Sequence, residues 1–332
     1  MASCTRATQQ VYNRDGAPQV SGPLITIVMP CFNVAATVAE TVESVRRQTL
    51  QDFELLAIDN NSTDATGAIL ESLARGFARM RVIRHPVQGL SAARNAGIRQ
   101  ARGRFVALVD ADDVWDAGYL EAHMANFTGS DIGVSYSRIR HVDWAGYPTG
   151  KSTRPKLAGL TAADLLISNP CTSLVVARRE VFETAGLFDE RLRRVEDQEW
   201  LFRVLITGCK LEGLDRVLAS YRLSPGGLSA NTGAMFESHG QMLEIAEAIA
   251  PSLVRRHRRV ARATMLRYCS RRSMDHGDGA AARAYLLRML REAPDLVLRQ
   301  PQATLSVIVE ILTPGLGEWL RRQRLPVQAK AE

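Results

Sequence analysis

Long apolar runs are missing from this 332-residue chain. No stretch approaches the run of about 20 apolar residues that a membrane-spanning helix needs. The first residues, MASCTRATQQVYNRDGAPQVSG, also lack the apolar core of a signal peptide. We therefore expect a soluble or peripheral protein in the cytoplasm.

Cysteine pairs and nucleotide-binding glycine motifs are missing as well. The five cysteines (Cys4, Cys31, Cys171, Cys209 and Cys269) lie far apart and form no CxxC pair. This spacing predicts neither a disulfide framework nor a structural zinc site, and it fits a reducing compartment. The absence of GxGxxG and GxxxxGK[ST] argues against a dinucleotide-dependent oxidoreductase and against a P-loop enzyme.

Positive charge is concentrated in the last part of the chain. The net charge is +7, and residues 251–332 carry 16 Lys+Arg against 7 Asp+Glu, whereas residues 1–250 carry 26 against 28. A nucleic-acid-binding protein would spread basic and aromatic residues over its main domain. We therefore predict no nucleic-acid partner.

An arginine-rich stretch in this tail allows two interpretations. It could form a basic face that rests on the anionic inner leaflet of the plasma membrane. It could equally be the solvated face of a helix that packs on the main domain, because charge runs are usually solvated. The residues concerned are Arg255, Arg256, Arg258, Arg259, Arg262, Arg267, Arg271 and Arg272.

Short apolar segments alternate with segments of helical periodicity in the first two thirds of the chain. This alternation predicts an α/β fold with a Rossmann-like, mostly parallel sheet flanked by helices. We expect a flexible lead-in (1–23), an α/β domain (24–230) and a basic α-helical C-terminal region (231–332). Strands are predicted at 24–29, 53–58, 81–84, 105–109, 132–137, 172–177 and 217–221, with an irregular stretch at 138–157 and a mobile loop at 222–229.

Three carboxylates follow the apolar segment Phe105–Val109: Asp110, Asp112 and Asp113. The carboxyl ends of strands in open α/β sheets are where ligands bind. Carboxylates this close repel one another unless a cation lies between them, and hard oxygen ligands suit Mg²⁺ or Mn²⁺ shared with a substrate phosphate. The alternative is an acidic turn in which Asp113 or Asp116 caps the next helix.

Four segments in order carry a resemblance: ITIVMPCFN (25–33), LLAIDNNSTDAT (55–66), QGLSAARNAGIRQARGRFVALVDADD (88–113) and GLFDERLRRVEDQEWLFR (186–203). Together they resemble the family 2 inverting glycosyltransferases, which have the GT-A fold and pass a sugar from a nucleotide donor to an acceptor hydroxyl. The resemblance covers roughly residues 24–230. It implies a divalent metal (Mn or Mg), a nucleotide-sugar donor with a UDP-sugar as first choice, and a glycan or lipid-linked acceptor in bacterial polysaccharide or glycolipid synthesis. The implied location is the cytoplasm, with possible peripheral contact at the inner face of the plasma membrane.

The resemblance implies nucleotide-binding roles at the ends of the first strands. Pro30, Phe32 and Asn33 are expected to form the floor of the nucleotide pocket. Asp59 is expected to hold the base or the ribose, where a buried acceptor gives strong selectivity. Arg94 lies in the segment that borders the nucleotide.

The resemblance also implies the reacting groups. Asp110 and Asp112 match the D-x-D element, whose metal bridges the diphosphate, and Asp112 is the expected direct ligand. Asp197 matches the catalytic base that takes the proton of the acceptor hydroxyl, and we expect Glu196 to raise its pKa by like-charge repulsion. Taken alone, Glu196-Asp197 would be an ordinary acidic helix N-terminus.

Two positions depart from the family pattern. Asn60 stands where the family often has Asp, which removes a charge beside Asp59. Trp200 lies in an atypical segment after Asp197, and we expect it in the core rather than beneath an acceptor. Two other functions stay open: a catalytically silent protein that binds a nucleotide sugar, and a nucleotidyltransferase that would not need Glu196-Asp197.

Overall fold

The strands of the protein form one sheet. The computed structural model describes residues 22–169, 171, 174–224, 227 and 230–313. Within these residues a 9-stranded sheet is built from β1 (Ile25–Cys31), β2 (Phe53–Asp59), β3 (Met80–Arg84), β4 (Phe105–Leu108), β5 (Val114–Trp115), β6 (Ile132–Val142), β7 (Pro148–Ser152), β8 (Val175–Arg178) and β9 (Lys210–Arg222).

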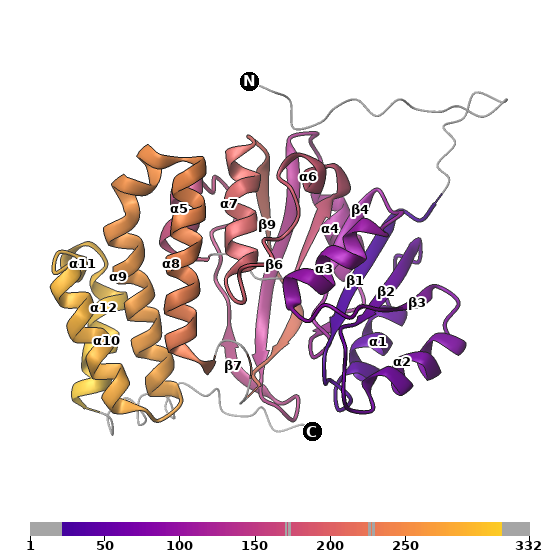
Figure 1. Ribbon diagram of the computed structural model, residues 1–332, viewed down its shortest axis with the longest axis horizontal. Coiled ribbons are helices and arrows are strands. Elements are labelled where there is room, and N and C mark those ends of the chain that lie inside the picture. The colour runs from indigo at the N-terminus through magenta and orange to yellow at the C-terminus, as the bar shows by residue number, and fades with distance from the viewer. Residues whose placement is uncertain (1–21, 170, 172–173, 225–226, 228–229, 314–332) are drawn as a thin grey trace, which may run out of the picture.

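Helices cover both faces of the sheet and form the C-terminal end of the described chain (Figure 1). The helix α5 begins at a capping box formed by Thr161 and Asp164, in which each side chain accepts the other's backbone N–H. The helices are α1 (Val38–Arg46), α2 (Thr66–Arg75), α3 (Leu90–Arg99), α4 (Tyr119–Asn126), α5 (Ala162–Ile167), α6 (Arg179–Thr184), α7 (Glu196–Ile206), α8 (Thr232–Ile249), α9 (Pro251–Asp275), α10 (Gly279–Glu292), α11 (Leu296–Arg299) and α12 (Pro301–Leu312).

The strand order is β3-β2-β1-β4-β8-β6-β9-β5, and β7 pairs with β6. The α/β class is confirmed. The four neighbouring strands β3, β2, β1 and β4 form the predicted parallel part of the sheet. Beyond β4 the sheet is mixed, because β8 runs antiparallel to both β4 and β6. The sequence pattern could not show this reversal, since either direction of β8 buries the same apolar side chains.

The parallel half brings the acidic strand ends to one edge of the sheet. Val28 of β1 lies opposite Leu108 of β4, and Cys31 lies opposite Asp59 of β2. Asp110 follows two residues after Leu108. The carboxyl ends of these parallel strands therefore meet where the sequence predicted a ligand site.

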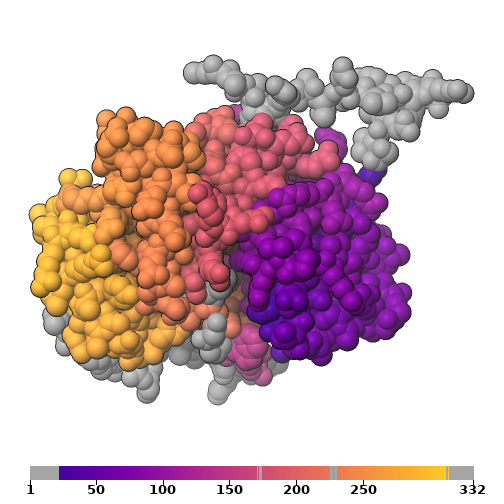
Figure 2. Space-filling model, viewed as in Figure 1, coloured from indigo at the N-terminus to yellow at the C-terminus, as the bar shows by residue number. Residues whose placement is uncertain are grey.

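Two hydrophobic layers hold the sheet. One face packs against α1, α2 and α4, and the other face packs against α3, α5, α6 and α7 together with α8 and α9. A third cluster joins α9, α10, α11 and α12. Figure 2 shows these last helices, in orange and yellow, at the end of the molecule opposite the first strands, in indigo.

The arginines of α9 contact neighbouring helices. Arg259 binds Asp295 at 2.6 Å, and Arg262 binds Glu292 at 3.2 Å. Arg267 donates to Oε1 of Gln300 at 2.6 Å. These contacts tie part of the charge run to the other C-terminal helices, and they give no support to a free basic face. Among the residues described, no helix has both the length and the apolar composition needed to cross a membrane.

Two local predictions are wrong. The stretch 138–157 is not irregular throughout, because β6 extends to Val142 and turns into β7, whose exposed sequence PTGKS has no apolar alternation to signal a strand. Pro30 does not end β1, which continues to Cys31. At Pro30 the strand pairs with β2 but no longer with β4, and proline is tolerated at such an edge.

Candidate active site

Arg94 lies at the centre of the candidate site, on the buried helix α3. Its Nη2 donates to Oδ1 of Asp110 at 2.8 Å, and its Nη1 donates to Oε1 of Glu196 at 2.6 Å. Only 1% of the Arg94 side chain is exposed. Burial opposes the charge, but Asp110 and Glu196 raise the pKa of the guanidinium above its ordinary value. Arg94 therefore stays charged and joins the turn after β4 to the start of α7.

The turn after β4 places its carboxylates in three different environments. Asp110 is partly exposed and paired with Arg94. Asp112 is half-buried, and burial followed by the charge of Asp110 raises its pKa to about 6. Asp113 is fully buried, and burial with the charges of Asp112 and Asp110 raises its pKa well above the usual range. Asp110 and Asp112, the two carboxylates of the D-x-D element, are thus less buried than Asp113.

The prediction that Asp113 or Asp116 caps the next helix is wrong. The helix α4 begins after Gly118, and no side chain caps it. The short strand β5 lies between the turn and this helix, which moves both carboxylates away from the helix start. Oδ1 of Asp113 instead accepts from the backbone N–H of Arg222 at 3.0 Å, and Asp116 pairs with Arg140.

Arg222 is a site residue that the sequence did not reveal. Its side chain is 4% exposed at the end of β9. Nε donates to the carbonyl of Asp112 at 3.0 Å, Nη1 to the carbonyl of Trp144 at 2.8 Å, and Nη2 to Oε2 of Glu40 at 2.6 Å. Arg222 thereby ties the D-x-D turn to α1. The sequence predicts a mobile loop from residue 222. The one signal for a buried, functional arginine is that Arg222 directly follows an apolar strand.

Asp197 lies in the first turn of α7, where two hydrogen bonds hold its carboxylate. Oδ2 accepts from Nδ2 of Asn169 at 2.9 Å, and Oδ1 accepts from the N–H of Gln198 at 2.8 Å. Val195, just before the helix, has a φ of 55°, which a β-branched residue rarely adopts. Such strain persists only where the surroundings impose it, and here it sets how α7 presents its first turn.

The two acids of this turn both have raised pKa values. For Asp197, burial is the largest cause of the raised pKa. The charge of Asp110 raises this pKa further, and the charge of Arg94 lowers it. Burial raises the pKa of Glu196 to about 7, with Arg94 opposing and Asp197 adding. The direction predicted for Asp197 is therefore right, but the predicted cause is not the main one. Glu196, 5% exposed and bound to Arg94, is also no ordinary solvated helix terminus.

The residues predicted to bind the nucleotide gather at the ends of β1 and β2, with Pro30 buried in β1. Asn33, with a φ of 52°, accepts from the N–H of Thr63 at 2.8 Å. Oδ1 of Asp59 accepts from the N–H of Ser62 at 3.1 Å. Phe32 is 43% exposed and so presents its ring at the surface of this edge.

Asn60 has a structural use for the amide that replaces the family's usual carboxylate. Its Nδ2 donates to the carbonyls of His85, at 3.2 Å, and Val87, at 2.6 Å. Its Oδ1 accepts from the N–H of Gly89 at 2.8 Å. An aspartate could not donate to the two carbonyls. Asn60 therefore fixes the segment that leads into α3 and Arg94.

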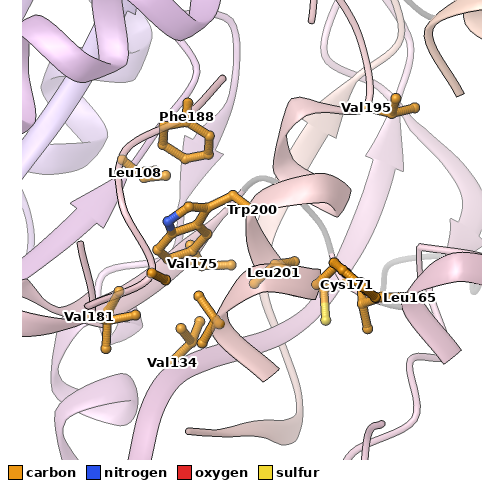
Figure 3. Close-up of a cluster of buried hydrophobic side chains, with 14 of the residues drawn as sticks. Leu108, Val134, Leu165, Cys171, Val175, Val181, Phe188, Val195, Trp200 and Leu201 are labelled. Carbon is orange, nitrogen blue, oxygen red and sulfur yellow. The ribbon is translucent and has the colours of Figure 1, made fainter. Parts of the chain in front are cut away.

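Trp200 lies in the core, as expected (Figure 3). It is 1% exposed and stacks on Phe182 with ring centroids 4.6 Å apart. Its Nε1 donates to the carbonyl of Gly186 at 3.0 Å. Trp200 thus anchors α7 in the core about one turn after Asp197.

The D-x-D turn offers two carboxylates that a metal ion could share with a ligand. In the part of the chain that the structure describes, no three His, Cys, Asp or Glu side chains are grouped to hold an ion. Asp110 and Asp112 supply a pair of hard oxygen donors, and Mg²⁺ is commonly bound by one or two carboxylates plus substrate phosphates. The donor set therefore fits an ion shared with a diphosphate.

Sequence comparison finds a family match. The family described as Glycosyl transferase family 2 matches residues 26–186, which include Asp59, Arg94, Asp110 and Asp112. Through this segment the chain is similar to glycosyltransferase family 2. Glu196 and Asp197 lie just beyond the matched segment.

Two curated relatives named as glycosyltransferases come from bacteria. This chain is 30% identical over 224 residues to the uncharacterized glycosyltransferase EpsJ of Bacillus subtilis. The aligned region covers 62% of this chain and 63% of EpsJ. The chain is 32% identical over 121 residues to WfgD of Escherichia coli, and the aligned region covers 36% of this chain and 47% of WfgD. WfgD is named a UDP-Glc:alpha-D-GlcNAc-diphosphoundecaprenol beta-1,3-glucosyltransferase. The chain thus spans less than two thirds of the length of both relatives.

Solved structures confirm the GT-A fold. S. aureus TarS 1–349 in complex with UDP-GlcNAc matches with a TM-score of 0.61 at 18% identity, over 91% of this chain and 93% of that chain. The mannosyltransferase PcManGT from Pyrobaculum calidifontis, in complex with GDP-Man and Mn²⁺, matches with a TM-score of 0.57 at 16% identity, over 89% of this chain and 88% of that chain.

Proposed function

We propose that this protein transfers a sugar from a nucleotide-diphosphate donor to an acceptor hydroxyl, with inversion and with the help of Mn²⁺ or Mg²⁺. The observation that carries the proposal is the buried bridge from Asp110 through Arg94 to Glu196. It supports a single site in which the D-x-D turn faces the acid that precedes Asp197. A protein that only bound nucleotide would not need the second acidic turn.

The donor side of the proposed site is the edge formed by β1, β2 and β4. Asp112 and Asp110 would hold the metal ion, which when bound neutralises the charge that develops on the leaving diphosphate. Asp59 and the surface formed by Phe32 and Asn33 would receive the nucleoside. A UDP-sugar is the donor we favour, because WfgD is named for UDP-Glc and the TarS structure holds UDP-GlcNAc.

The acceptor side of the proposed site is the first turn of α7. The acceptor oxygen attacks the anomeric carbon, the bond from that carbon to the diphosphate oxygen breaks, and the carboxylate of Asp197 takes the hydroxyl proton. Asn169 and the N–H of Gln198 hold this carboxylate in one orientation. Its raised pKa brings it closer to the value at which a base works well near neutral pH.

The acceptor we favour is a lipid-linked glycan in bacterial polysaccharide synthesis. WfgD is named for an acceptor sugar on diphosphoundecaprenol. We therefore place the enzyme's work at the cytoplasmic side of a membrane, where such an acceptor would be presented.

Hydrolysis of nucleotide sugars without acceptor tests the proposal. We expect a UDP-sugar to be hydrolysed slowly in the presence of Mn²⁺, and Asp197→Asn to lower that rate while UDP still raises the melting temperature. Asp52→Asn, at an exposed position away from the site, is the matched control. Binding without hydrolysis of any UDP-, GDP- or TDP-sugar would favour the silent binding protein. Full activity of Asp197→Asn in forming a nucleotide sugar and pyrophosphate from a sugar phosphate and a nucleoside triphosphate would favour a nucleotidyltransferase.

A further inference from the structure

The turn between β6 and β7 exposes two large aromatic side chains to solvent. We call residues 143–147 the aromatic turn. Trp144 is 46% exposed and Tyr147 is 71% exposed. Among the tryptophans that the structure describes, Trp115 and Trp200 are buried, so Trp144 is the one that can contact a ligand. Single exposed apolar residues are ordinary, whereas two aromatic rings within one short turn point to a binding surface.

Hydrogen bonds within the aromatic turn fix its backbone. The N–H of Asp143 donates to the carbonyl of Tyr147 at 2.9 Å, and the N–H of Tyr147 donates to Oδ1 of Asp143 at 2.9 Å. The N–H of Gly146 donates to the carbonyl of Asp143 at 3.0 Å. Gly146 has a φ of 92°, a conformation that glycine adopts without steric cost. The turn therefore presents its aromatic residues from an ordered backbone.

Arg222 joins the aromatic turn directly to the D-x-D turn. Its Nη1 donates to the carbonyl of Trp144 at 2.8 Å, and its Nε donates to the carbonyl of Asp112 at 3.0 Å. A β-carbon built on Gly146 would lie 3.4 Å from the same Nη1, so the turn also packs closely on this guanidinium. A guanidinium is planar and its donors have fixed directions. Trp144 is therefore held beside the proposed metal site by two hydrogen bonds of one buried side chain.

The strand order separates the aromatic turn from the proposed nucleoside pocket. In the order β3-β2-β1-β4-β8-β6-β9-β5, the D-x-D turn follows β4. Asp59 ends β2 on one side of β4, whereas β6, which leads into the aromatic turn, lies on the other side. A ligand that extends from the D-x-D turn away from the nucleoside therefore passes the aromatic turn. In the proposed reaction this ligand is the acceptor.

We propose that the ring of Trp144 is a stacking platform for a pyranose ring of the acceptor. A pyranose carries its hydroxyl groups around the rim and presents C–H groups on its faces. These C–H groups are attracted to the negative face of an aromatic ring, and stacking removes their apolar area from water. The inference rests on the proposed function, of which a sugar acceptor is a part. It makes the aromatic turn a binding subsite that needs no charge on the acceptor.

Kinetics with neutral acceptors tests the platform. The probes are the methyl glycosides of glucose, galactose, mannose and N-acetylglucosamine. We expect Trp144→Ala to raise KM for an accepted glycoside about 3- to 10-fold, the effect of losing one stacked ring pair, and Trp144→Phe to recover most of the loss. KM for the UDP-sugar and its hydrolysis without acceptor should stay unchanged, because the bond to Arg222 uses the backbone carbonyl of residue 144. Leu298→Ala, at a position 84% exposed on α11, is the matched control.

Saturation-transfer NMR with the same methyl glycosides measures the contact without turnover. We expect the ring C–H protons of a bound glycoside to receive saturation from the wild type and from Trp144→Phe, and to lose it in Trp144→Ala. Equal binding by wild type and Trp144→Ala, or an equal KM for the acceptor, would overturn the platform. A rise in KM for the donor alone would assign Trp144 to the donor and would also overturn it. Binding that depends on Trp144 in a protein that uses no donor would instead refute the proposed function and leave the platform supported.

Discussion

Arg94 and Glu196 are 102 positions apart in the chain, and a hydrogen bond of 2.6 Å joins them. The same guanidinium binds Asp110, so one buried cation lies between two carboxylates. With Asp112 and Asp197 close by, the site carries an excess of negative charge that suits a divalent cation. The relationship makes the helix α3 the connection between the D-x-D turn and the first turn of α7.

Replacing Arg94 should be strongly destabilising. Arg94→Met leaves Asp110 and Glu196 without their cation, and breaking a buried ion pair in this way costs about 3–5 kcal/mol. Urea unfolding of Arg94→Met and of Arg99→Met measures the effect. Arg99 is on the same helix with 57% of its side chain exposed, so its loss should cost less than about 1 kcal/mol. Equal stability of the two variants would contradict the bridge.

Removing the proposed base should affect catalysis far more than donor binding. Asp197→Asn keeps the size of the side chain but cannot accept the proton, so we expect kcat to fall by about 10²- to 10⁴-fold. The Kd for UDP should change little, because we propose Asp197 for the acceptor side of the site. Steady-state kinetics measures kcat, and calorimetry measures the Kd for UDP. A kcat within threefold of wild type, which is a change of about 0.7 kcal/mol in activation free energy, would exclude Asp197 as the base.

The D-x-D turn should control the response to metal. Asp112→Asn removes one of two carboxylates from the proposed ion, so we expect a higher Mn²⁺ concentration at half-maximal activity, by about tenfold or more. A Mn²⁺ titration at saturating donor measures this concentration. Asp116→Asn, whose carboxylate pairs with Arg140, is the control. An unchanged Mn²⁺ requirement in Asp112→Asn would refute the assignment of this residue as a ligand.

Asn60 should not tolerate the residue that the family often has there. Asn60→Asp leaves the carbonyls of His85 and Val87 without their donor and places a carboxylate beside them. We expect a loss of about 1–3 kcal/mol in the free energy of unfolding. Asn61→Asp, at the exposed neighbouring position with a φ of 65°, is the matched control. Chemical unfolding of the two variants distinguishes a site-specific effect from a general effect of charge.

Asp113 should make stability depend on pH. Its pKa is raised in the folded protein, so its stabilising contribution is complete below the unfolded pKa and is lost as pH rises through the folded pKa. Asp113→Asn keeps an oxygen for the N–H of Arg222 and removes the titration. We expect this variant to gain stability relative to wild type between pH 5 and pH 8. Urea unfolding at both pH values measures the change, and a constant difference would contradict a raised pKa.

The sequence was sufficient where position along a strand determines position in space. Asp59 and Asp110 could be placed at one edge because parallel strands end together. The partners of Asn60 and Arg222 could not be predicted, because each bond depends on how loops meet across the fold. Asp113 was misassigned because the two residues of β5 are too few to show a strand pattern.

The buried bridge has a consequence for engineering this enzyme. Because Arg94 binds one carboxylate after β4 and one at the start of α7, the half that carries the D-x-D turn and the half that begins near α7 are not independent modules. A chimera that takes α7 from one glycosyltransferase and α3 from another would combine an arginine and a glutamate that were never selected together. Exchanges of specificity in this scaffold should therefore carry α3, the turn after β4 and the start of α7 as one unit.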